Sequence, residues 1–344
     1  MVPAQPPKGI RSIAANGSDG TDPAAYARAS RSPAVAHRIE LPVPFPLGTV
    51  NAWLFAGSQP ALVDCGVASS RSYQALLDGL RAAGCDPASL TLYVTHGHVD
   101  HAGNARRLRD DFGVQLLAPA SEAEYIETFR RDGPRRNDEF AAALRAHGVP
   151  EDAVLRMRAD SDAIDRFLED SPIAGEPGAR VVLGDTDAQV IATPGHTPGS
   201  TSFLLSEDND MVTGDTLLQI ITSNAVELRD ADRGRYHQYL ATLDGMRAFV
   251  GVTCLPGHHA PFRLTDAILD DHLGRHEKRR QVILSLLARP RTGYGLFPLV
   301  FPGLDGDPAL FMGMAEIVGH LHALEMDGLV RRQDETGIRH FVAT

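Results

Sequence analysis

The chain has 344 residues, a formal net charge of −11, and hydrophobic and charged contents of 43% and 22%. This length and composition are typical of a globular protein with one large domain and a small one. The acidic balance argues against broad attraction to nucleic acid or anionic membranes. The three cysteines are widely spaced and suggest no disulfide framework, so a cytoplasmic location is expected. No apolar run approaches the roughly 18 residues that span a bilayer, so no membrane partner is expected.

The N-terminal segment over residues 1–36 is rich in Pro, Ala, Ser and Gly and lacks hydrophobic periodicity, which predicts a disordered leader. From residue 37 onward, apolar runs bounded by Gly and Pro predict strands, and apolar residues at helical spacing predict helices. The expected elements of this part are strands at 38–45, 50–55 and 61–66, a helix at 70–83, a strand at 90–95, a helix at 104–111 and a strand at 114–119.

Residues 121–170 differ from their surroundings, because they are charged, arginine-rich and helical in pattern. We interpret them as a helical insertion. The expected elements beyond it are strands at 181–184, 189–193, 202–206 and 211–215, a helix at 236–250 and a strand at 252–255. Strands and helices therefore alternate over residues 37–264, which predicts one large domain interrupted by the insertion.

The last 80 or so residues, 265–344, have another pattern. Long helices are expected at 266–288 and 309–326, and a terminal hairpin is expected to turn at D-E-T-G. Helices followed by a two-stranded wing predict a small winged-helix domain. The apolar run at 297–301 is expected to be core, with a partner surface, and hence a homodimer, as the alternative.

Seven histidines and aspartates lie in clusters associated with strand-like runs. The first cluster, T-H-G-H-V-D-H, follows the strand at 90–95, and single residues follow in T-P-G-H-T-P-G-S, T-G-D-T and P-G-H-H. Imidazoles and carboxylates together suit borderline divalent metals such as zinc. Because strand ends can meet at one edge of a sheet, we expect these side chains to converge on one metal centre. The candidate ligands are His96, His98, Asp100, His101, His196, Asp215 and His258.

The spacing H-x-H-x-D-H can send one pair of ligands to one metal and the second pair to a neighbouring metal. A central carboxylate such as Asp215 is suited to bridging both ions. Two ions ~3.5–4 Å apart are usual in hydrolytic sites, where they lower the pKa of a shared water. The expected cofactors are therefore two divalent metal ions, zinc first, with iron or manganese as alternatives.

These motifs resemble those of the metallo-β-lactamase superfamily over residues 37–264, and the resemblance includes Asp64 in L-V-D-C-G. It implies an α+β fold, a four-layered αββα sandwich with the metals at one edge of its sheets. It also implies that Asp64 is structural and that Asp215 is shared by the two metals. The implied ligands of the first metal are His96, His98 and His196, and those of the second are Asp100, His101 and His258.

The complete ligand set resembles the glyoxalase II, lactonase and nuclease branches more than the true β-lactamases. The C-terminal region is similar to the tail of the LACTB2-like branch and unlike the glutathione-binding tail of glyoxalase II, so glutathione thioesters are not implied. The expected activity is that of a dinuclear hydrolase in which a metal-bridging hydroxide cleaves a small ester, thioester or lactone. The alternative is a LACTB2-like endoribonuclease that hydrolyses phosphodiesters.

Two residues are candidates for catalytic proton transfer. They are Asp100 and His259, the latter standing where the family commonly has glycine. The expected partner is a small anionic or acyl substrate, since formal charges leave the metal shell at about +1. Nucleic acid is less favoured, because the helix at 309–326 has no Lys or Arg. The basic residues that remain for an RNA surface are Arg279, Arg280, Arg331, Arg332 and Arg339.

Two further classes remain as alternatives. The first is a winged-helix regulator that uses an inactive hydrolase fold as a sensor, which the intact ligand set disfavours. The second is an iron oxygenase of the same superfamily, which would use mainly His96, His98 and His196. Metal analysis separates them, because two zinc ions indicate hydrolysis and a single iron indicates oxidation.

Overall fold

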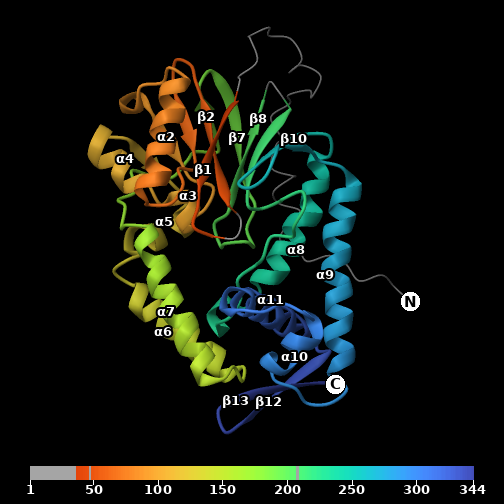
Figure 1. Cartoon of the computed structure of the whole chain (residues 1–344). Coiled ribbons are helices and arrows are strands. Elements are labelled where there is room, and N and C mark those ends of the chain that lie inside the picture. The colour runs from red at the N-terminus through yellow and green to blue at the C-terminus, as the bar shows by residue number, and fades with distance from the viewer. Residues whose placement is uncertain (1–35, 46–47, 207–208) are drawn as a thin grey trace.

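The computed structural model describes residues 36–45, 48–206 and 209–344 (Figure 1). The predicted leader over residues 1–36 therefore lies outside the described residues, except for Ala36, which begins the first strand. Within the described part of the chain, no helix is long and apolar enough to cross a bilayer.

Two sheets form the centre of the molecule. In the first, β1 to β5 are ordered as in the sequence, with β1, β2 and β3 antiparallel and β3, β4 and β5 parallel. In the second, the order is β11-β10-β9-β8-β7-β6, and only β9 and β10 pair in parallel among these described strands. The bounds are β1 Ala36–Pro42, β2 Thr49–Phe55, β3 Ala61–Val63, β4 Thr91–Tyr93, β5 Gln115–Leu117, β6 Arg180–Leu183, β7 Thr186–Ala192, β8 Thr201–Leu205, β9 Asp210–Gly214, β10 Thr253–Pro256 and β11 Phe262–Arg263.

Side-chain alternation along β2 explains how the layers stack. Val50 and Leu54 belong to the core beneath the helices, whereas Trp53 and Phe55 belong to the core between the two sheets. Successive side chains of a strand point to opposite faces, so a strand buried on both faces must be apolar along its whole length. The predicted strand at 50–55 meets this requirement except at Asn51, whose buried amide donates hydrogen bonds to Pro256 O and His259 O.

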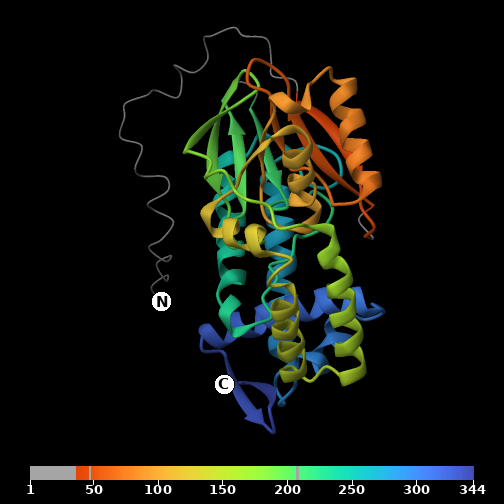
Figure 2. The same ribbon diagram turned by 90° about the vertical axis from the view of Figure 1, so that its left-hand side faces the viewer.

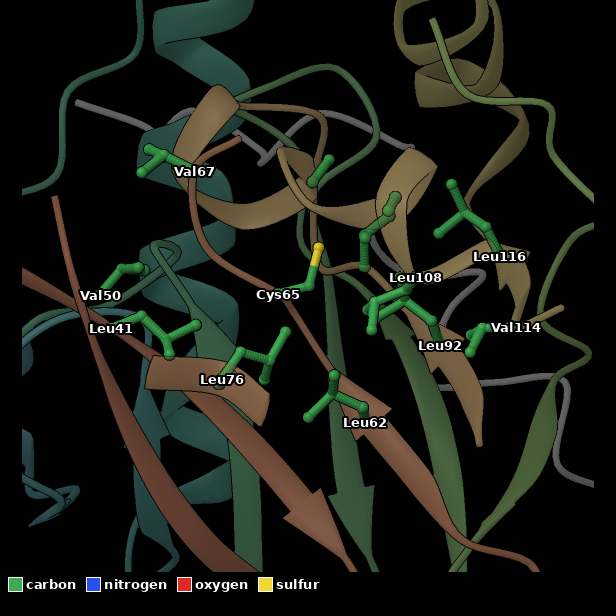
Figure 3. Packing of buried hydrophobic residues seen from close by; sticks show 14 of the residues in the cluster. Leu41, Val50, Leu62, Cys65, Val67, Leu76, Leu92, Leu108, Val114 and Leu116 are labelled. Carbon is green, nitrogen blue, oxygen red and sulfur yellow. The ribbon is translucent and has the colours of Figure 1, made fainter. Parts of the chain in front are cut away.

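Helices cover the outer faces of both sheets. On the first sheet lie α2 (Ser70–Ala82) and α4 (Ala105–Phe112), whose buried leucines pack in the cluster shown in Figure 3. On the second lie α8 (Arg235–Gly245) and α9 (Asp266–Leu286), through a core that includes Tyr239. The predicted four-layered αββα sandwich is therefore confirmed.

Local sequence signals explain where α2 begins and ends. The side chain of Ser69 accepts a hydrogen bond from the backbone N–H of Ser72, as an N-cap does. Leu76 and Leu80 are buried one turn apart, and Gly84 follows the helix with a φ of 68°. Glycine adopts this left-handed conformation without the steric cost that a Cβ would add.

The insertion is helical, as predicted. It contains α5 (Ala120–Thr128), α6 (Gly133–Ala146) and α7 (Glu151–Ile164). In Figures 1 and 2, α6 and α7 run from the sandwich toward the C-terminal helices. Their buried side chains, among them Leu144 and Val154, join one core with residues of the C-terminal region.

The C-terminal region contains α9, α10 (Gly293–Val300), α11 (Asp307–Met326) and the hairpin β12–β13 (Val330–Glu335 and Ile338–Ala343). Thr336 and Gly337 form its two-residue turn, and both have positive φ, which suits a tight hairpin. Helices and hairpin are the expected elements, while the winged-helix assignment and the domain boundaries stay predictions. The apolar run is divided, since Phe297 is core and Leu299 is 45% exposed, so a homodimer also stays a prediction.

Burial predicts which leucines stabilise the sandwich. Replacing the fully buried Leu62 of β3 by alanine should lower the free energy of unfolding by about 2–5 kcal/mol, through lost burial and a residual cavity. Leu155 of α7, which is 54% exposed, is the matched control and should change stability by less than about 0.5 kcal/mol. Denaturant titration measures both, and equal effects would contradict the assigned core.

Candidate metal centre

Strand direction brings the predicted ligand loops to one edge. β3 and β4 run parallel in the first sheet, and β7, β9 and β10 share one direction in the second. Their carboxyl ends therefore meet at the same edge of the sandwich. A bond from Thr201 N to Thr95 O (2.9 Å) and another from Asn51 N to Gly257 O (2.7 Å) tie the two sheets together there.

Three histidines from two loops form the first ligand group. His96 Nε2 lies 3.1 Å from His98 Nδ1, which lies 3.0 Å from His196 Nε2. Nitrogens bound tetrahedrally to zinc at ~2.0–2.1 Å are about 3.3 Å apart. The three ring nitrogens thus stand close to the spacing that a bound ion requires.

Asp100, His101 and His258 form the second group, and Asp215 lies between the two groups. Asp215 Oδ1 is 3.5 Å from His101 Nε2, while Asp215 Oδ2 is 3.5 Å from His258 Nε2 and 3.8 Å from His196 Nε2. His258 Nε2 is also 3.4 Å from Asp100 Oδ2. All seven predicted ligands are brought together by the fold, and Asp215 lies within 4 Å of ligands from both groups.

Hydrogen bonds on the outer side of the rings fix their orientation. His101 Nδ1 is 2.7 Å from Asp64 Oδ2, His258 Nδ1 is 2.7 Å from Thr49 O, and His196 Nδ1 is 2.8 Å from Asn224 O. Partners of this kind set the tautomer and leave the other nitrogen for a metal. Asp64 also accepts bonds from the backbone and hydroxyl of Thr95, so its predicted structural role is confirmed.

The pKa values divide the histidines into two classes. Burial lowers the pKa of His96 and His196, and burial with the neighbouring His196 lowers that of His98 to about 3. Burial also acts to lower the pKa of His101 and His258, but nearby carboxylates, Asp215 foremost, outweigh it. The pKa of His258 rises to about 10 and that of His101 rises well above its usual value. Neutral imidazoles therefore form the first group, and protonated ones stand in the second.

The donor set fits two divalent ions. His101 Nε2, His258 Nε2 and Asp215 Oδ1 are buried and have no hydrogen-bond partner among the described residues, although their other polar atoms are bonded. A buried polar atom left without a partner costs about 1–3 kcal/mol. Each of these atoms faces the cluster, so cations placed there would satisfy them.

The two proton-transfer candidates occupy different surroundings. Asp100 lines a cavity of about 590 Å³ beside the ligands, together with His98 and His196. His259 has a positive φ of 65°, and its backbone oxygen accepts a bond from Asn51 Nδ2 at 2.8 Å. Among the described residues it joins no ligand group and does not line this cavity.

Five histidines that lie outside the ligand motifs are also buried, and nothing in their sequence context indicated this burial. They are His147, His272, His276, His320 and His322. His276 and His320 also lie close to Glu316, and these three side chains are of types that can bind a metal. Arg279, however, pairs with this carboxylate, which thus already has a cation partner. We therefore assign no metal to this group.

Glu122 was also missed, because it lies in the helical insertion and outside every motif. Its side chain is almost completely buried and bonds to backbone amides of two ligand loops. A buried carboxylate on a helix whose other glutamates are exposed is a signal that appears only once the fold is known.

Metal binding should release protons. The raised pKa values of His101 and His258 mean that both hold a proton at pH 7 without metal, and a metal requires the neutral ring. Apparent metal affinity should therefore fall as the pH falls from 9 to 6. Calorimetric zinc titrations in buffers of different ionisation enthalpy measure the release, and a heat independent of buffer would contradict it.

Comparisons with known proteins point to a single family. The family model of the metallo-beta-lactamase superfamily matches residues 45–258. The hydroxyacylglutathione hydrolase GloC of Haemophilus influenzae is 30% identical over 152 residues, which are 44% of this chain and 59% of that relative. The chain thus spans less than two thirds of that relative's length. A beta-lactamase-like protein 2 homolog of Caenorhabditis elegans is 23% identical over 250 residues, 72% of this chain and 68% of that relative.

Solved structures extend the likeness to the whole fold. A beta-lactamase domain protein from Burkholderia ambifaria superposes with a TM-score of 0.79 at 22% identity, covering 95% of this chain and 97% of that chain. This coverage includes the insertion and the C-terminal helices, so both belong to a recurring architecture. With the family model matching more than half of its length, the chain belongs to the metallo-beta-lactamase superfamily.

Proposed function

We propose that this protein is a metal-dependent hydrolase that binds two divalent ions and cleaves a small ester, thioester or lactone. Zinc is the first candidate for both ions. The observation that carries the proposal is the cavity of about 590 Å³ that opens onto His98, Asp100 and His196. Pockets for small ligands have volumes of about 300–1,000 Å³. A small substrate could therefore lie against the proposed metal ligands.

The cavity walls suit an acyl compound with a polar or anionic part. Aromatic side chains of the insertion, of α11 and of the loop after β1 offer apolar surface. Arginines from α6, from α8 and from the loop before α8 add guanidinium groups, each of which is also paired with a carboxylate of the chain. Apolar walls with a few polar groups are usual for small-molecule sites. These lining residues are Phe45, Tyr125, Phe129, Phe140, Phe311, Arg135, Arg136, Arg229 and Arg235.

The chemistry divides between the ions and the chain. When bound, two divalent ions supply an acidified water and a Lewis acid that polarises the scissile carbonyl. Asp100 lies at the boundary between ligand cluster and cavity, where a carboxylate can hold or pass a proton to a leaving group. His259 is the second candidate for that transfer. The thioester option is supported by the relative named as a hydroxyacylglutathione hydrolase.

The RNA alternative loses support from the C-terminal region. The helix α11, which matches the helix expected at 309–326, buries most of its central residues against its neighbours. Four of the five candidate arginines pair with carboxylates, which reduces their attraction for phosphates. These pairs are Arg279–Glu316, Arg280–Asp327, Arg332–Asp230 and Arg339–Asp230.

A substrate screen tests the proposal. Purified, zinc-replete protein should hydrolyse members of a panel of acyl thioesters, esters and lactones and leave RNA intact. His98→Ala should reduce the rate by more than about 100-fold, because losing a ligand costs more than the 10–100-fold typical of outer partners. The control is His237→Ala, a partly exposed histidine of α8, which should retain activity. Cleavage of RNA alone would overturn the assignment, and one iron per chain would redirect it to oxidation.

Proton transfer can be assigned by paired variants. Asp100→Asn should lower kcat by about 10²–10⁴-fold, the usual contribution of acid–base catalysis, and should change the pH profile of kcat. His259→Gln should have the smaller effect, because His259 does not line the cavity. Metal content must be measured for both, since Asp100 is also a proposed ligand. A large loss confined to His259→Gln would assign the transfer to His259.

A further inference from the structure

One carboxylate of the insertion joins two loops that carry metal-ligand candidates. Glu122, on α5, is only 2% exposed. Its Oε2 accepts a hydrogen bond from Gly97 N at 2.9 Å, and its Oε1 accepts one from Gly199 N at 2.6 Å. Bonds from amides to an ionised carboxylate are stronger than those between neutral groups.

The two amides belong to the loops of the first ligand group. Gly97 lies between His96 and His98, and Gly199 lies three residues after His196. The two loops are 100 residues apart in sequence and follow strands of different sheets. Through Glu122 they are held by a single side chain that belongs to neither loop.

The close approach of α5 makes this arrangement rigid. A Cβ built on Gly97 would lie 2.8 Å from Tyr125 Cδ1, and one built on Gly199 would lie 2.7 Å from Glu122 Cγ. Such distances are shorter than real Cβ contacts, so a larger residue at either position would displace the Tyr125 or the Glu122 side chain. The helix therefore rests directly on both loops.

The remainder of the insertion anchors α5. Arg136 of α6 donates to Phe129 O (2.9 Å) at the end of α5 and to Asp165 Oδ1 (2.8 Å) after α7. Its guanidinium also lies 4.1 Å from the centre of the Phe129 ring. Displacing α5 would therefore break its contacts with Arg136, which is itself held by Asp165 after α7.

We propose that Glu122 is a positioning residue that fixes the mutual geometry of His96, His98 and His196, so that the insertion is part of the metal centre as well as a wall of the cavity. This inference rests on the proposed function, since it presumes that these histidines bind a metal. Glu122 itself binds no metal in this proposal. It acts through the backbone of the two loops.

The test compares isosteric variants of one helix. Glu122→Gln keeps the size of the side chain but turns an NH₂ group toward one of the two amides, which breaks that bond. Glu127→Gln is the matched control, because Glu127 is also on α5 and accepts a bond from the Ile173 amide, away from the ligand loops. Each protein is titrated with zinc against a competing chelator, and its metal content is determined.

The expected result is selective. Glu122→Gln should weaken one of the two bound ions by about 10–100-fold, as loss of an outer partner does, while the other ion and the Glu127→Gln control stay near wild type. In a His258→Ala background, which disables the second group, Glu122→Gln should weaken the remaining ion by the same factor. Glu122→Asp, too short to reach both amides, should reproduce the loss with the charge retained and decides the matter if Glu122→Gln does not fold.

The contrary outcomes separate the two proposals. Wild-type affinities in Glu122→Gln, with two ions bound, would overturn the positioning role and leave the proposed function standing. Equal weakening of both ions together with a lower melting temperature of the metal-free protein would show a general structural role and overturn the inference. A wild-type protein that binds no metal would overturn the proposed function and this inference with it.

Discussion

Seven ionisable side chains are packed almost out of water at one edge of two sheets, and that burial is the constraint on which the rest of the structure depends. Imidazoles and carboxylates in such a place are costly unless each polar atom has a partner. The outer atoms obtain theirs from Asp64, Thr49 and Asn224, while several inner atoms face one another across the cluster. The sandwich thus holds the candidate ligand atoms in position, and bound cations would satisfy the atoms that still lack a partner.

The insertion and the C-terminal region lie outside the sandwich and contribute to the walls of the cavity beside the ligands. α5 lies against the ligand loops, whereas α6 and α7 extend away and share a core with α9, α10 and α11. Arg156 of α7 adds an ion pair with Asp307 at the start of α11 (2.8 Å). The cavity beside the ligands is consequently bounded by three parts of the chain that are distant in sequence.

The sequence predicted most of the strands and the convergence of the seven candidate ligands for a physical reason, while the sandwich followed from the resemblance to the family. Strands that are buried on both faces are largely apolar, so they stand out as hydrophobic runs. The candidate ligands that follow these runs are His and Asp residues in short loops bounded by Gly and Pro. Glu122 gave no such signal, since an acidic residue in a charged helix is usually solvated and only the fold shows what lies against it. The same applies to His320 and His322, whose burial depends on helices packed from elsewhere in the chain.

The shared core of α7 and α11 has a consequence for biosynthesis. More than a hundred residues separate the two helices along the chain, so an emerging polypeptide exposes the apolar side of the insertion until α11 leaves the ribosome. Contacts this distant in sequence slow the completion of a fold. The sheets can assemble earlier, but the cavity beside the ligands is complete only once α11 has been synthesised and has packed against the insertion.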